Sequence, residues 1–135
     1  KEKEAYEVAN SFTSFLMENA EEAKGYYITT SQFESFITAL KDIRNVVAHD
    51  NLLLGYRSEN DLDFIGPIFN SWGITKADKR DYVFDIYLIM QVFLSRSQFR
   101  DLTYNIQASI EGLKKEINEK AFKMVMKDLG FPEDF

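Results

Sequence analysis

Residues 30–49 read TSQFESFITALKDIRNVVAH, and this stretch decides the fold class. Apolar side chains recur in it every three or four residues, a spacing that places them on one face of an α-helix. That face comprises Phe33, Phe36, Ile37, Leu40, Ile43 and Val47. Thr30 or Ser31 is a suitable N-cap, and Glu34 would complete a capping box three residues after Ser31. The stretch therefore predicts a long amphipathic helix that runs to about His49 or Leu53.

The same periodicity covers most of the chain and predicts an all-α bundle of about five helices. The connection over residues 55–77 is polar and contains turn-forming Gly and Pro, with room for one short helix near 61–71. Ser97 is the expected N-cap of the fourth helix, and Gly130 is expected to end the last one. The predicted helices cover residues 3–23, 30 to about 49 or 53, about 77–96, 97–117 and 119–130.

The length and composition favour a single globular domain. The chain has 135 residues with 45% hydrophobic side chains, including 12 Phe and 7 Tyr, enough for one sizeable core. It begins at Lys1 inside a helical pattern, so we expect residues 1–135 to be one domain of a longer protein. No apolar run is long enough to cross a bilayer, which favours a cytoplasmic protein with no membrane partner.

Charge and metal-ligand composition restrict the possible functions. With no Cys and one His, a disulfide framework and the common zinc sites are excluded, and no metal or cofactor is expected. The net charge of −6 argues against sequence-independent coating of nucleic acid. The net charge does not exclude a local basic pocket, because several cations could converge in the fold. These are Lys41, Arg44, Arg57, Lys76, Lys79 and Arg80.

The single histidine lies in the segment RNVVAH, residues 44–49, at the end of the predicted helix. Asn45 and His49 are four residues apart and share a helix face, and Arg44 is long enough to reach along it. Histidine can transfer a proton near neutral pH, and the arginine fork matches phosphate oxygens. Asparagine can orient the histidine or a ligand hydroxyl. Together these groups are suited to cleaving RNA without a metal, with Arg44 stabilising charge on the phosphate.

A purely structural interpretation of the same segment stays open. Arg44 would then pair with Asp42 or Glu34, and His49 would only mark the end of the helix. Arginine and histidine at this spacing occur often by chance.

Two other groups of residues have a functional and a structural interpretation. Carboxylates are the ligands that Mg²⁺ prefers, and three of them lie close in sequence at Glu59, Asp61 and Asp63. The structural interpretation, a solvent-exposed acidic loop, is the more common one. Trp72 with Phe69 offers a surface for base stacking, whereas aromatic residues beside isoleucines more often belong to the core.

Two stretches resemble a known family. LKDIRNVVAHDNLLLGYR, Leu40–Arg57, resembles the R-N-x-x-A-H core of Abi-like (abortive infection) proteins of the HEPN superfamily. The tail MKDLGFPEDF resembles the GFP-x-x-aromatic ending of the same proteins. The matching positions are Arg44, Asn45, Ala48, His49, Leu53, Tyr56, Arg57, Gly130, Phe131, Pro132 and Phe135.

The resemblance implies a HEPN-like helical bundle and a metal-independent endoribonuclease. It implies a site formed where two motifs meet across a homodimer, with Arg44, Asn45 and His49 as catalytic residues. It also implies a role in bacterial anti-phage defence, or as a toxin restrained by an antitoxin protein or RNA. Asp50 departs from the family pattern and places a carboxylate directly after the histidine.

We further expect Lys41, Tyr56 and Arg57 to bind the RNA substrate. The alternative function is a non-catalytic helical module that binds RNA, a nucleotide or a protein partner, with Arg44 as its anion anchor.

Overall fold

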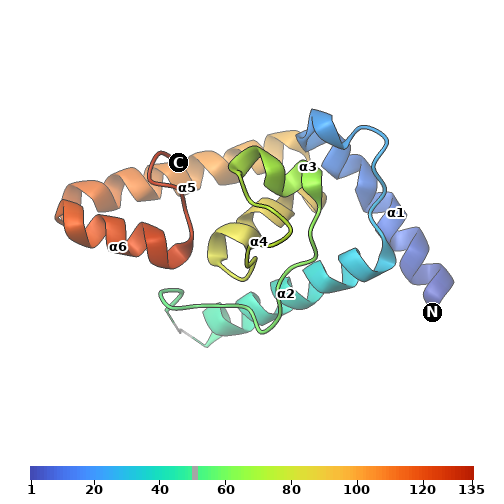
Figure 1. The fold of residues 1–135 in the computed structure, drawn as a ribbon, viewed down its shortest axis with the longest axis horizontal. Helices are drawn as coiled ribbons and strands as arrows, with labels where there is room; N and C mark the ends of the chain where they lie inside the picture. Colours follow the sequence, from blue (N-terminus) through green and yellow to red (C-terminus); the bar gives the residue numbers. More distant parts are fainter. Residues whose placement is uncertain (50–51) are drawn as a thin grey trace.

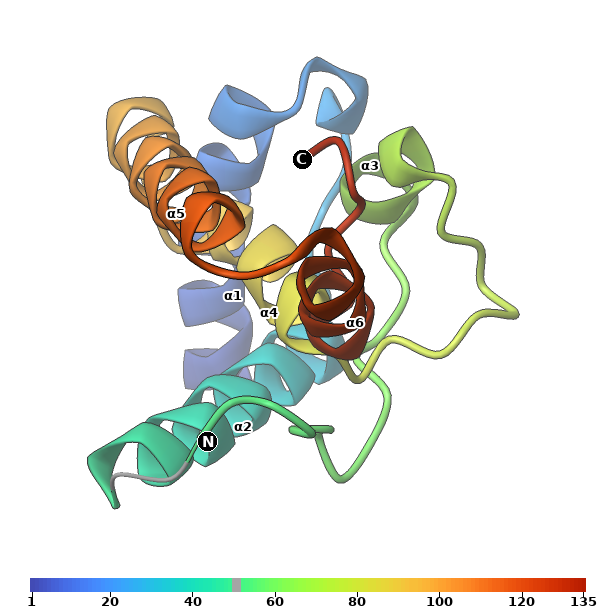
Figure 2. The same ribbon diagram turned by 90° about the vertical axis from the view of Figure 1, so that its left-hand side faces the viewer.

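Helix α4 (Val83–Ile89) lies at the centre of the structure, a computed structural model that describes residues 1–49 and 52–135. From Phe84 to Ile89 every side chain of this helix is buried. Figures 1 and 2 show α4 enclosed by the longer helices and by the segment that carries α3. A helix that is apolar nearly all round requires such a central position.

The described residues form six α-helices and three 3-10 helices, and they contain no strand. The all-α prediction is therefore confirmed, although five helices was too few. Figures 1 and 2 show α5 and α6 side by side as a hairpin that extends from the body. The elements are α1 (Glu2–Asn19), η1 (Glu21–Ala23), α2 (Thr30–Ala48), α3 (Gly66–Phe69), η2 (Asn70–Trp72), α4 (Val83–Ile89), η3 (Met90–Val92), α5 (Arg96–Glu116) and α6 (Glu119–Leu129).

The N-terminus of α2 has a capping box, but it lies two residues earlier than predicted. The Thr29 hydroxyl accepts a hydrogen bond from the Gln32 backbone N–H at 3.1 Å. The Gln32 side chain in turn accepts one from the Thr29 backbone N–H at 2.9 Å. The predicted pair of Ser31 and Glu34 is wrong, because Thr29 already satisfies the first free N–H groups of the helix.

The buried face of α2 is narrower than the sequence pattern. Phe36 and Ala39 are buried, and Phe33, Leu40, Ile43 and Val46 pack partly against the core. Two predicted core residues are wrong, since Ile37 is 42% exposed and Val47 is 55% exposed. Helix α2 packs against α1 and α4.

The predicted third helix over residues 77–96 is wrong in its extent. Helix α4 begins only at Val83, and α5 begins at Arg96 with Ser95 as its N-cap instead of Ser97. The residues before α4 bond to a distant segment: the Asp81 carbonyl accepts from Ser58 N–H at 2.8 Å, and the Arg80 carbonyl accepts from Leu62 N–H at 2.9 Å. Carbonyl groups used in this way are not available for helical bonds.

A buried guanidinium fixes this irregular segment. Arg80 is 8% exposed, and its Nε donates to the Leu62 carbonyl at 2.7 Å. Its Nη1 donates to the carbonyls of Asp78 at 2.6 Å and Lys76 at 3.0 Å. Arg80 thus satisfies backbone acceptors that no secondary structure pairs, and it is not available to a basic pocket.

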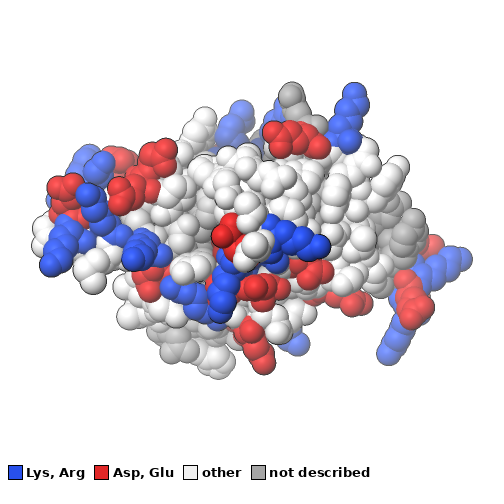
Figure 3. All heavy atoms as spheres, in the orientation of Figure 1, with Lys and Arg blue, Asp and Glu red and all other residues white. Residues whose placement is uncertain are grey.

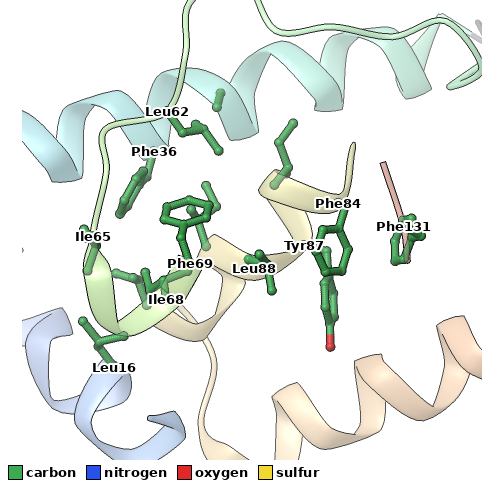
Figure 4. Packing of buried hydrophobic residues seen from close by; sticks show 14 of the residues in the cluster. Leu16, Phe36, Leu62, Ile65, Ile68, Phe69, Phe84, Tyr87, Leu88 and Phe131 are labelled. Carbon is green, nitrogen blue, oxygen red and sulfur yellow. The ribbon is translucent and has the colours of Figure 1, made fainter. Parts of the chain in front are cut away.

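The core joins aliphatic side chains around α3 and α4 to an aromatic cluster at the C-terminal end, both visible in Figure 4. Phe131 lies 4.9 Å from Phe84 and 5.0 Å from Phe135, measured between ring centroids. Tyr87 lies 5.3 Å from Phe135. The aromatic residues of the GFPEDF tail therefore pack into the core beside α4, each contact adding about 0.5 to 1.5 kcal/mol beyond the apolar burial itself.

Asp85 is a buried carboxyl in the centre of the fold, 3% exposed. Burial raises its pKa to about 6; a hydrogen bond from the Tyr82 N–H opposes this and the neighbouring Asp81 adds to it. An acid whose pKa is raised by folding favours the protonated state, so stability is lost as pH rises from about 4 through about 6. Asp85→Asn, which keeps an oxygen acceptor for Tyr82, is expected to stabilise the fold at pH 8 by about 2 to 3 kcal/mol.

Urea unfolding of the wild type and Asp85→Asn between about pH 4 and pH 8 measures this effect. The two proteins should converge in stability at the acid end and separate as pH rises. The exposed Asp101→Asn is the matched control and should follow the wild type throughout. A constant difference between wild type and Asp85→Asn at all pH values would contradict the assignment.

Candidate functional site

The segment RNVVAH forms the last two turns of α2, and His49 is the C-cap residue of this helix. The His49 backbone N–H donates to the Asn45 carbonyl at 3.2 Å. Ile43 and Val46 anchor these turns to the core from the opposite side. The motif is therefore carried by a regular helix up to its last residue, as predicted.

The side chains of Arg44, Asn45 and His49 are all exposed. Among the described residues, none forms a hydrogen bond or ion pair with any of these three side chains. The structural interpretation, in which Arg44 pairs with Asp42 or Glu34, is therefore not observed. Asp50, the departure from the family pattern, lies outside the described residues.

Tyr56, predicted to bind RNA, is instead 8% exposed. Its hydroxyl donates to Asp42 Oδ2 at 2.8 Å, which fixes the chain after the motif against α2. Burial, and then the hydrogen bond to Asp42, raise the pKa of the Tyr56 phenol. The buried ring offers little surface on which a base could stack.

Arg57, the second predicted RNA ligand, is held by the C-terminal end of α6. Its Nη1 donates to the Asp128 carbonyl at 2.8 Å, and its Nη2 lies 3.7 Å from Asp128 Oδ1. The guanidinium also lies over the Tyr82 ring, 3.8 Å from the centroid. The backbone N–H of Gly55 donates to the same Asp128 carboxylate. These contacts, which we call the Asp128 clasp, tie residues 55–57 to α6.

Lys41, the third predicted RNA ligand, lines a groove of about 500 Å³ between α2 and the segment 58–63. Asn45 lies in the same groove, whereas Arg44 and His49 do not. Five carboxylates and one lysine supply its charged groups, so the groove as a whole repels phosphate. Figure 3 shows acidic side chains over this part of the molecule. The carboxylates belong to Glu34, Asp42, Glu59, Asp61 and Asp63.

The predicted acidic loop contributes to this groove without forming a metal centre. Asp61 accepts a hydrogen bond from the Arg80 N–H at 3.2 Å, and Asp63 accepts one from the Ser31 hydroxyl at 3.4 Å. Within the described part of the chain, no three His, Asp or Glu side chains lie close enough together to hold a metal ion.

The aromatic pair proposed for base stacking is mainly structural. Phe69 is completely buried, and Trp72 packs edge-on against Phe84 with ring centroids 5.2 Å apart. Trp72 is still 42% exposed, so one side of its ring reaches solvent.

One charged surface, on α6, was not predicted from the sequence. The core side of this helix carries Phe122 and Met126, both buried. Its outer side carries Lys120, Lys123 and Lys127 around a hollow of about 470 Å³. The spacing of three and four residues places these lysines on one face, and this pattern would have revealed the surface. We call Lys120, Lys123 and Lys127 the α6 lysine face.

Comparison with protein-family models, curated proteins and solved structures finds no match to this chain. In the part of the chain that the structure describes, no helix is both long and apolar enough to cross a membrane.

Proposed function

We propose that this chain is a metal-independent endoribonuclease in which Arg44, Asn45 and His49 form the reacting surface. The observation that supports the proposal is the exposure of these three side chains on the last turns of a capped helix, free of side-chain partners among the described residues. A proton-transfer group and a permanent cation are thus held close in sequence on a rigid element, yet accessible to a substrate.

The proposed reaction is an attack of the ribose 2′-oxygen on the adjacent phosphorus. His49 accepts the 2′-hydroxyl proton as the new P–O bond forms, and Arg44 stabilises the negative charge on the phosphoryl oxygens. The bond from phosphorus to the 5′-oxygen then breaks, and that oxygen takes up a proton. The products are a 2′,3′-cyclic phosphate and a 5′-hydroxyl end. Asn45, four residues before His49, orients the imidazole or a ribose hydroxyl.

The reaction requires a base and an acid, but each chain has one histidine. A homodimer would supply the second imidazole from the partner chain. Exposed apolar side chains beside the motif support such a contact, since Val47 is 55%, Leu52 78% and Leu54 50% exposed. Large exposed apolar side chains gathered in one place are typical of protein interfaces.

The resemblance to Abi-like HEPN proteins supports the same reaction and suggests its setting, which is anti-phage abortive infection or a toxin–antitoxin pair. In that setting an antitoxin protein or RNA would restrain the activity.

The reaction class is tested by incubating the protein with RNA in the presence and absence of EDTA. Cleavage should be unaffected by the chelator, and the products should carry 2′,3′-cyclic phosphate ends. Arg44→Ala should reduce the rate by about 10²-fold or more, since a lost donor to transition-state charge costs this much in other enzymes. Products with 3′-hydroxyl ends, or inhibition by EDTA, would exclude the mechanism.

A second candidate is a non-catalytic module that binds a partner protein in the groove beside Lys41. The five carboxylates of that groove favour a cationic segment over RNA. Under this alternative, Asp61→Asn and Asp63→Asn should weaken partner binding while the His49→Ala substitution has no effect on it.

A further inference from the structure

The α6 lysine face brings three cationic side chains of one helix together around one hollow. Lys120, Lys123 and Lys127 are exposed and border one hollow, together with Met124, which is 64% exposed. Figure 3 shows Lys and Arg side chains over α6 on the left of this view, with Asp and Glu side chains beside them. The three lysines extend about 10 Å along the helix, at a rise of 1.5 Å per residue.

Nearby carboxylates neutralise this surface only in part. Glu119 pairs with Lys123 at 3.3 Å, but both side chains are largely exposed, at 84% and 52%. An exposed pair four residues apart contributes a few tenths of a kcal/mol and yields easily to a stronger anion. Glu133 also borders the hollow. Asp128 neutralises the lysines less than Glu119 does, because its carboxylate pairs with Arg57 and accepts a hydrogen bond from the Gly55 N–H.

The lysine face is connected to the RNVVAH segment by the Asp128 clasp. Asp128 directly follows Lys127, and it binds residues 55 and 57, which follow the motif along the chain. In Figure 1, the C-terminal end of α6 lies next to the segment that continues from α2. The lysine face and residues 55 and 57, which follow the motif along the chain, are thus in contact through Asp128.

We infer that the α6 lysine face binds the phosphate backbone of single-stranded RNA and delivers it to the motif at the end of α2. This inference rests on the proposed ribonuclease function and adds to it the surface that holds the substrate. The acidic groove beside Lys41 cannot take this role, because its carboxylates repel phosphate. Met124 and Pro132 give the same hollow an apolar rim that suits the face of a sugar or base.

The test measures binding of a short fluorescein-labelled single-stranded RNA of mixed sequence by fluorescence anisotropy, in the full chain carrying His49→Ala to prevent cleavage. The triple substitution Lys120→Gln, Lys123→Gln, Lys127→Gln retains side-chain length and helix propensity. Three lost phosphate contacts should weaken binding about 100-fold at 0.1 M salt. They should also reduce the slope of log K against log salt by about 2.

The matched control replaces three exposed lysines outside α6, Lys1, Lys3 and Lys24, by glutamine. It changes the net charge by the same amount, so its RNA affinity should stay within about twofold of the parent, since those lysines make no phosphate contact in this proposal. Wild-type affinity in the α6 variant, or equal weakening in both variants, would overturn the inference. An α6 variant that keeps its RNA affinity but no longer binds polyglutamate would assign the face to an acidic protein and also overturn it.

The experiments distinguish a failure of the RNA-binding surface from a failure of the proposed ribonuclease function. If RNA binds the lysine face but the protein carrying His49 never cleaves it, the ribonuclease proposal fails and the binding surface stands. If RNA is cleaved but the α6 substitutions leave binding and cleavage unchanged, the binding surface fails and the ribonuclease proposal stands.

Discussion

His49→Ala is expected to reduce RNA cleavage by about 10²- to 10⁴-fold, the usual contribution of a positioned general acid or base. The chain has no other histidine that could replace it. Because the side chain is exposed, its loss should change the free energy of unfolding by no more than about 0.5 kcal/mol. A loss of activity at constant stability would therefore report on chemistry and not on folding.

Cleavage rates are best compared at equal concentrations, with thermal unfolding measured on the same samples. Tyr104→Ala on α5 is a suitable control, since this side chain is 62% exposed on a different helix. Added imidazole should partly restore the rate of the alanine variant if the ring of His49 transfers a proton. Wild-type cleavage by His49→Ala would end the ribonuclease proposal.

Among substitutions that add a single methyl group, Gly130→Ala is expected to cause the largest loss of stability. Gly130 ends α6 with a backbone φ of +81°, a conformation that residues other than glycine rarely adopt. A Cβ there would lie 2.6 Å from the Tyr82 Cβ and 2.8 Å from its Cγ. Tyr82 cannot easily retreat, because the Arg57 guanidinium lies 3.8 Å from the centroid of its ring. Backbone strain and overlap together predict a loss of about 3 to 4 kcal/mol.

Gly25→Ala separates the two contributions. Gly25 has nearly the same φ, +82°, but an added Cβ would meet nothing within 4 Å. It should lose only about 1 kcal/mol, the cost of the left-handed conformation alone. In thermal unfolding, Gly130→Ala should melt about 10 to 15 °C below the wild type and clearly below Gly25→Ala. Equal losses in the two variants would show that contact with Tyr82 has no energetic consequence.

Local sequence features predicted the end of α6, but not the end of the first helix, which was expected at residue 23 and lies at Asn19. Helix α6 ends at Gly130 as predicted, because the glycine cap acts within a few residues. The third helix was predicted too long, because the carbonyls of Arg80 and Asp81 bond to residues 62 and 58. No periodicity rule can detect such a distant partner.

The same distinction applies to the candidate site. The exposed positions of Arg44, Asn45 and His49 followed from helical spacing alone. Tyr56 and Arg57 were expected to face RNA, but Asp42 and Asp128 engage them. Arg57 and Asp128 are 71 residues apart, so their contact could not be inferred from either local sequence. The roles of all these residues in RNA cleavage remain predictions.

The Asp128 clasp also sets an order of events during protein synthesis. Gly55 and Asp128 are separated by 73 residues, so the segment after RNVVAH has no clasp until most of the chain has been translated. At 5 to 20 residues per second, this delay lasts about 4 to 15 s. In a nascent chain arrested before α6, helix α2 would be complete, but the segment that follows it would lack its contacts with Asp128. Under the proposed function, the segment that follows the reacting residues would therefore gain its contacts with α6 only after most of the chain has been synthesised.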